Sequence, residues 1–186
     1  MLNAERAGGD NLKPYLRVYD VQWGSITVAD LPLMDFPPDA QRRYRLIPGD
    51  LLVNEGGSYV GRSAIWEGQL EECYYQKALH RLRPIDKQSD IAAFLLLLME
   101  AAVSQGVFVA GGNQTTIDHL TAEQLKRYRF GFPPVGEQGE IVEQCRNHLN
   151  YISGVSMKVT SSFERLQEYR SSLITAAVTG QIEGLQ

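Results

Sequence analysis

The side chains best suited to chemistry in this sequence are hydrogen-bonding groups gathered between residues 54 and 81. Amide, hydroxyl and cationic side chains of this kind contact base edges and phosphates in protein–DNA complexes. The candidates for a DNA-binding surface are Asn54, Ser58, Tyr59, Arg62, Gln76, Lys77 and Arg81. Exposed strand residues that bind nothing have the same composition, and spacing alone does not separate the two interpretations.

Two features of this region bear on nucleic-acid binding. If residues 76–83 form a strand, Lys77, Arg81 and Arg83 share one face, because side chains alternate along a strand. Between Arg42 and Arg83 there are seven Lys or Arg residues and five Asp or Glu residues, whereas the whole chain has a net charge of -4. A nucleic-acid-binding domain is usually basic. We therefore expect a weakly positive patch that needs other subunits to hold a polyanion.

Patterns for catalysis or metal binding are not found in the sequence. His80, His119 and His148 are far apart and do not have metal-ligand spacing. Gly56-Gly57 lacks the Lys-Ser/Thr continuation of a P-loop and the third glycine of a dinucleotide-binding fingerprint. No segment resembles a binding motif for S-adenosylmethionine. We expect a protein that is not an enzyme, without catalytic residues or metal ligands.

The cysteines, the apolar runs and the first residues of the sequence bear on cellular location. Cys73 and Cys145 have neither the number nor the spacing of a disulfide framework. The longest apolar run, residues 91–103, is shorter than the ~20 residues that span a bilayer. Residues 1–10 are polar and glycine-rich, unlike a secretory signal. We expect a cytoplasmic protein with no membrane association.

The elements that position the polar groups are expected to form an α+β domain, mostly β with short helices, over residues 1–132. Strands are predicted at residues 16–21, 44–53, 59–66 and 76–83, with a turn at residues 48–50. Residues 90–104 are predicted to form a buried helix that ends before Gly106. Thr121 and Gln124 have the spacing of a capping box at the start of a short helix.

After Pro133-Pro134 the apolar residues follow helical spacing. Two apolar positions per heptad, over about five heptads, predict a long coiled-coil helix within residues 133–183. The residues expected to pair are Cys145, Leu149, Ile152, Val159, Phe163, Leu166 and Leu173. About 40 helical residues make a rod of about 60 Å, which a domain with a radius of about 15–20 Å cannot cover. We expect a partner helix; the alternative is a helix that folds back on its own domain or breaks at Ser153-Gly154.

Short motifs follow one another in a fixed order along the chain. They are Pro14-Tyr15-Leu16-Arg17-Val18, Gly49-Asp50-Leu51-Leu52-Val53-Asn54-Glu55-Gly56-Gly57, Val60-Gly61-Arg62-Ser63-Ala64-Ile65-Trp66, Tyr75-Gln76-Lys77-Ala78-Leu79, Pro133-Pro134-Val135-Gly136-Glu137-Gln138, and Arg170, Leu173, Ile174 with Ala176-Ala177-Val178-Thr179-Gly180-Gln181-Ile182. Each motif alone is weak. In this order, over roughly residues 12 to 183, they resemble the specificity subunits of type I restriction–modification systems.

The resemblance implies a division of labour between subunits. Residues 1–132 would be a target-recognition domain that reads one half of a split site in double-stranded DNA. Residues 133–183 would be a spacer helix that pairs antiparallel with the helix of a second copy or of another specificity half. Modification (methyltransferase) subunits docked around the helices would bring S-adenosylmethionine, and a motor/endonuclease subunit would bring ATP and Mg. No cofactor is then expected on this chain.

The sequence departs from this family in two ways. A usual specificity subunit carries two recognition domains and two helices, whereas this chain has one of each, and its domain is expected to be N-terminally incomplete. The chain is either a half-subunit that dimerises on an inverted repeat, or a truncated specificity fragment that acts only as a coiled-coil interaction module. A third hypothesis, an enzyme of unknown type, would require turnover that survives deletion of residues 139–183.

Overall fold

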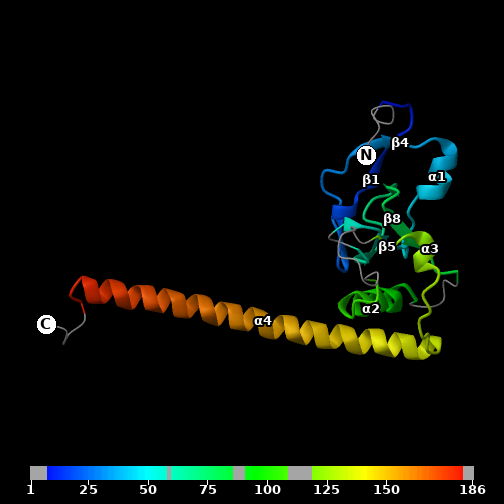
Figure 1. Cartoon of the computed structure of the whole chain (residues 1–186). Helices are drawn as coiled ribbons and strands as arrows, with labels where there is room; N and C mark the ends of the chain where they lie inside the picture. The colour runs from blue at the N-terminus through cyan, green and yellow to red at the C-terminus, as the bar shows by residue number, and fades with distance from the viewer. Residues whose placement is uncertain (1–7, 58–59, 86–90, 109–118, 182–186) are drawn as a thin grey trace. The chain divides into compact units, whose positions relative to one another are not determined.

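The computed structural model describes residues 8–57, 60–85, 91–108 and 119–181 of the chain (Figure 1). The chain divides into two compact units, Met1–Val142 and Glu143–Gln186. The first unit contains the described strands and three shorter helices, and the second contains most of one long helix. The expected combination of mixed sheets and short helices with a long C-terminal helix is therefore confirmed.

The first sheet is built on the strand β1 (Leu12–Leu16). β1 pairs antiparallel with β4 (Leu33–Asp35) and parallel with β7 (Tyr74–Tyr75). Between β1 and β4, the short 3-10 helix η2 (Val18–Asp20) leads into a hairpin of β2 (Val21–Gln22) and β3 (Ser25–Ile26). Because β7 comes from a distant part of the sequence, this sheet fixes the segment that precedes Gln76 and Lys77.

The second sheet has the order β6-β5-β8, with all pairs antiparallel. Its central strand β5 (Leu51–Asn54) is fully buried, between β6 (Ser63–Ile65) and the edge strand β8 (Leu79–Leu82). Side chains alternate along β5. Leu52 therefore packs in one hydrophobic cluster with Trp66, and Leu51 packs in another with Met99. In Figure 1, β5 and β8 lie between the first sheet and α2, in agreement with the two clusters.

Three short helices complete the first unit. α1 (Pro38–Tyr44) begins with proline, whose fixed φ and missing N–H suit the first turn of a helix. α2 (Ile91–Ser104) packs Met99 and Ala102 on the second sheet, whereas Glu100, Ala101 and Ser104 are exposed, so the expected buried helix is buried along one face only. α3 (Ala122–Leu125) has the predicted capping box: Gln124 N donates to Thr121 Oγ1 over 3.2 Å, and Thr121 N donates to Gln124 Oε1 over 2.8 Å.

All four strand predictions were too long. In the segment 59–66 only β6, Ser63–Ile65, is strand, because Val60 and Gly61 form a turn. The segment expected to be a strand from residue 16 turns into η2, because the Asp20 carboxylate accepts the N–H of Arg17 over 2.7 Å. Such local side-chain bonds compete with strand pairing. In the segment 44–53, Tyr44 ends α1, and the Asp50 carboxylate accepts the N–H of Ile47 over 2.9 Å in the predicted turn. In the segment 76–83 only β8, Leu79–Leu82, is strand.

The long helix α4 (Val135–Val178) has 44 residues and continues without interruption through Ser153 and Gly154. The alternative of a break at that point was therefore wrong. The expected stop at Gly180 is confirmed: its φ is 71°, its N–H donates to Ala177 O, and the N–H of Gln181 donates to Ala176 O. This pair of bonds is a Schellman motif.

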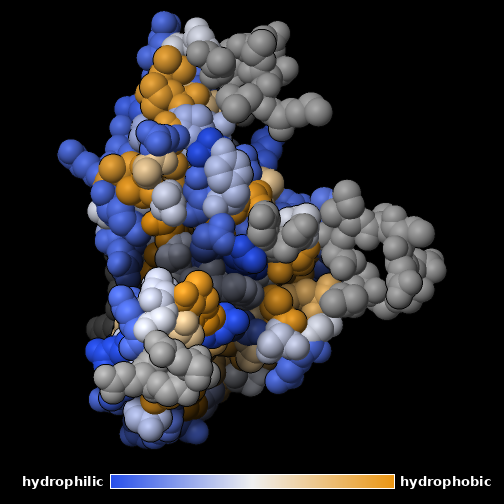
Figure 2. All heavy atoms as spheres, turned by 90° about the vertical axis from the view of Figure 1, so that its left-hand side faces the viewer, coloured by the Kyte–Doolittle hydropathy of each residue, from blue (hydrophilic) through white to orange (hydrophobic). Residues whose placement is uncertain are grey.

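Two surface properties complete the description. Within the residues that the structure describes, no helix has both the length and the apolar character needed to cross a bilayer. On the face shown in Figure 2, hydrophobic side chains lie in separate groups among hydrophilic ones.

Candidate nucleic-acid interface

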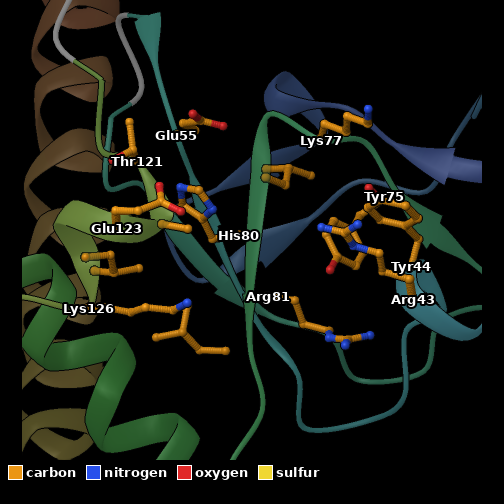
Figure 3. A pocket seen from close by; sticks show the side chains of 14 residues that line it. Arg43, Tyr44, Glu55, Tyr75, Lys77, His80, Arg81, Thr121, Glu123 and Lys126 are labelled. Carbon is orange, nitrogen blue, oxygen red and sulfur yellow. The ribbon is translucent and has the colours of Figure 1, made fainter. Parts of the chain in front are cut away.

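A groove with a volume of about 670 Å³ runs along β8 in the first unit (Figure 3). Its lining comes from the end of α1, the residue after β5, the segment from β7 to β8, and the residues from Thr121 to Lys126. The charged and ring-bearing side chains that line it are Arg43, Tyr44, Glu55, Tyr75, Lys77, His80, Arg81, Glu123 and Lys126. Segments far apart in the sequence thus combine four Arg or Lys side chains with two carboxylates in one concave surface.

One side of the groove holds two guanidinium groups against a pair of tyrosine rings. Arg81 donates from Nη1 to the carbonyl oxygen of Arg45 over 2.9 Å, and its guanidinium carbon lies 5.6 Å from the centre of the Tyr75 ring. Tyr75 meets Tyr44 edge-on, with ring centres 5.3 Å apart, and the Arg43 guanidinium lies 5.4 Å from the Tyr44 ring centre. Cation–π contacts of this type favour a fixed orientation of the arginines.

Tyr75 contributes no charge at neutral pH. Burial raises the pKa of the Tyr75 hydroxyl above its ordinary value, and the nearby Arg81 opposes this rise only in part. The ring therefore stays neutral while it supports the cations. In Figure 3, Arg43, Tyr44 and Tyr75 gather on one side of β8, and Thr121, Glu123 and Lys126 lie on the other side.

The other side is tied to the sheet by backbone bonds at Glu55. Glu55 N donates to Ala78 O over 3.0 Å, and Leu120 N donates to Glu55 O over 2.6 Å. His80 strengthens the same connection, because its Nε2 lies 2.5 Å from the carbonyl oxygen of Leu120 and donates to it. These bonds fix the start of the segment that carries Lys126, which itself is exposed.

The structure brings together two of the seven candidate residues in this groove, Lys77 and Arg81. Gln76 is half-buried beside them, with its N–H donating to Leu16 O over 3.1 Å. Arg62 donates to the side-chain oxygen of Gln22. Ser58 and Tyr59 lie outside the described residues.

Asn54 has a structural environment. Its side chain is fully buried, and its Nδ2 donates to the carbonyl oxygens of Val18 over 3.0 Å and Val21 over 3.4 Å. A side chain in this position joins β5 to the η2–β2 segment and does not reach a base edge. Arg83, expected to share a face with Lys77 and Arg81, donates to the Arg45 carbonyl oxygen as Arg81 does, over 3.3 Å, and it also forms a two-pronged ion pair with the fully buried Asp50, at 2.6 and 2.7 Å.

The sequence did not point to Arg43, Tyr44, Tyr75 or Lys126. The Pro37-Pro38 pair before a helix-forming segment is a signal for α1, and it could have suggested that Arg43 lies on a helix. Nothing local places that helix beside residues that follow Thr121. Their meeting depends on the pairing of β1 with β7 and of β5 with β8.

The second candidate surface is the apolar stripe of α4. Leu149, Ile152, Val159, Phe163, Leu166 and Leu173 are all exposed, and Cys145 is half-buried. Ile152 is 61% exposed and Leu166 is 65% exposed, whereas large apolar side chains in a protein core are buried. Val155 and Tyr169, each three residues after a member of this set, are exposed too and widen the stripe.

The chain is similar to known proteins in sequence and in fold. A family model described as the type I restriction modification DNA specificity domain matches residues 36–153. A chain in a solved structure, described as the structural basis of complex assembly and conformational transition of the type I R-M system, has a similar fold, with a TM-score of 0.68 and 18% sequence identity. The similarity covers 89% of this chain and 38% of that chain. No curated protein matches the chain.

Proposed function

This chain belongs to the family of type I restriction modification DNA specificity domains, and we propose that it is a sequence-specific DNA-recognition subunit. In this proposal the first unit reads one half of a bipartite site. The long helix pairs with the helix of a second copy and so sets the distance between two half-sites. Methyl transfer and cleavage belong to partner subunits, and this chain has no catalytic role.

The observation that carries the proposal is the exposed stripe of α4. Burying each large apolar side chain contributes roughly 1.5–3 kcal/mol, so the exposed set represents a strong drive to associate. Two copies related by a two-fold axis bury the same stripe on both sides and are closed against further growth. An antiparallel pair of this kind presents two identical recognition domains, which fits an inverted repeat in DNA.

The width of the stripe supports further partners. Val155 and Tyr169 add a third apolar position in two of the heptads, beyond the two of a simple pairing seam, whereas the equivalent positions His148 and Ser162 are polar. A face of that width is typical of a helix in a bundle. Helices of modification subunits would occupy the remaining surface and place their S-adenosylmethionine sites near the DNA.

Solution mass tests the assembly part of the proposal. Light scattering on a sizing column should give a dimer for the chain alone and a larger complex after co-expression with a type I modification subunit. A monomer that ignores the modification subunit would remove the mechanical basis of the proposal. A dimer that recruits it yet shows no preference among DNA sequences would instead be a coiled-coil interaction module.

A further inference from the structure

We propose that the groove along β8 holds one sugar–phosphate strand of the DNA duplex, with Arg43, Lys77, Arg81 and Lys126 contacting its phosphates. This inference rests on the proposed function, since it assigns the backbone-binding site of the same domain. It adds two residues, Arg43 and Lys126, from segments that precede and follow the strand in the sequence.

Charge is the first argument. The chain as a whole is acidic, with a net charge of -4, yet four Arg or Lys side chains and only two carboxylates line the groove. Phosphate neutralisation by such side chains supplies most of the sequence-independent affinity for DNA. An acidic chain that binds DNA must concentrate its cations where the backbone passes, and this groove is such a concentration.

Shape is the second argument. Base edges lie at the floor of the DNA grooves and are reached by protruding helices, strands or loops. A concave surface fits the part of the duplex that stands out, which is the sugar–phosphate strand. β8 is the edge strand of its sheet, so its outer side is open to the groove within the described residues.

Pre-organisation is the third argument. The Arg81 guanidinium uses one N–H on the Arg45 carbonyl and rests on Tyr75, which leaves its other donors in a fixed fork. The aliphatic side chains of Leu79, Leu82 and Leu125 line the same groove. Apolar side chains beside the cations lower the effective dielectric constant there, which strengthens ionic contacts.

Neighbouring cations provide matched controls. Arg42 and Arg43 are adjacent on α1 and both are exposed, but only Arg43 lines the groove. Lys126 and Arg127 are likewise adjacent and exposed, and only Lys126 lines it. Replacing either member of a pair with alanine removes the same charge from the chain, so a difference between them reports on the groove.

The experiment measures binding of the full chain, assembled with its modification subunits, to random-sequence duplex DNA over a series of salt concentrations. Arg43→Ala and Lys126→Ala should each lower the slope of log affinity against log salt by about one, and the double variant by about two. Arg42→Ala and Arg127→Ala should leave the slope unchanged. Thermal unfolding of each variant shows whether it is folded.

Removal of a carboxylate from the groove gives a second readout, because it should change DNA affinity in the opposite direction. Glu123 lines the same side of the groove as Lys126, and Glu123→Gln removes a carboxylate that repels phosphate. This variant should bind every duplex several-fold more tightly, without a change in the sequences enriched from a random pool. Weaker binding with a changed sequence preference would mean that the groove reads bases, and the backbone assignment would be overturned.

The remaining outcomes separate the groove from the proposed function. If the wild-type complex enriches a DNA sequence and the groove variants keep its salt slope, the groove assignment alone is wrong, and the cations serve another partner such as an acidic protein surface. If the controls lose as much slope as the groove variants, the effect is one of net charge and the assignment also fails. A wild-type complex that binds no DNA overturns both proposals.

Discussion

The ion pair between Asp50 and Arg83 distinguishes an arginine that stabilises the fold from an arginine that is a candidate for DNA binding. The Asp50 carboxylate has no exposed surface, and Arg83 meets both of its oxygens. Burial of an ionised carboxylate requires such a partner. The next cation toward the N-terminus, Arg81, has no carboxylate partner in the described residues and lines the groove instead. Two arginines two positions apart on the same segment therefore have different tasks.

We expect Arg83→Ala to affect mainly stability and Arg81→Ala to affect mainly DNA binding. Arg83→Ala leaves a buried charge without its partner and should lower the free energy of unfolding by about 1–3 kcal/mol, since solvent reaches the half-exposed arginine position. Arg81→Ala should cost less stability and weaken DNA binding. Urea unfolding and a salt-dependent binding assay measure the two effects. Equal stability losses would show that Arg83 has no special structural role.

Cys73 and Cys145 should differ in reactivity. Burial raises the pKa of the Cys73 thiol to about 12, so the reactive thiolate is absent at neutral and mildly alkaline pH. In a folded chain whose helices are kept apart by Ile152→Asp and Leu166→Asp, a thiol reagent should therefore modify Cys145 and reach Cys73 only after unfolding. The Cys145→Ser variant should then show no fast labelling. Fast labelling of that variant would mean that the packing around Cys73 opens readily.

At the scale of elements, the proposed pairing of α4 depends on its exposed apolar stripe. Ile152 and Leu166 lie on the exposed stripe, whereas Asn147 and Ser161 are exposed and lie neither three nor four residues from any member of the stripe. An aspartate in a paired apolar seam is a buried, unpartnered charge and is costly. The same aspartate off the stripe stays in water. Whether two helices pair should therefore depend on which face of the helix carries the aspartates, and not on the total charge of the helix.

Ile152→Asp combined with Leu166→Asp is expected to convert the dimer into a monomer. The control, Asn147→Asp combined with Ser161→Asp, adds the same charge to the opposite side of the helix and should remain dimeric. Light scattering gives the mass of each variant, and circular dichroism confirms that the helix persists. Should the stripe variant keep the dimer mass, the pairing surface would have to be sought elsewhere.

Elements also show what the sequence could and could not predict. The long helix, its end at Gly180 and the capping box of Thr121 follow from local spacing and were found. The strand extents failed where the carboxylates of Asp20 and Asp50 bond to nearby backbone N–H groups. Of the residues that line the groove, the sequence predicted only Lys77 and Arg81 as DNA-binding candidates. No local pattern predicts which distant segments the sheets bring together.

At the scale of the whole molecule, the proposed assembly has two identical domains joined by paired helices. The match to the similar chain from a solved type I R-M structure covers 38% of that chain's length. A two-fold pair would supply a second domain and a second helix by symmetry. Two identical domains read the same half-site in opposite orientations, so the target should be an inverted repeat whose gap is set by the helices.

Selection from random duplex DNA tests this central claim most directly. The wild-type chain, assembled with a type I modification subunit, is incubated with a random-sequence pool, and the bound DNA is sequenced. The account predicts enrichment of an inverted repeat with one fixed gap between its halves. Enrichment of no sequence, or of a single half-site with no fixed partner, would contradict it.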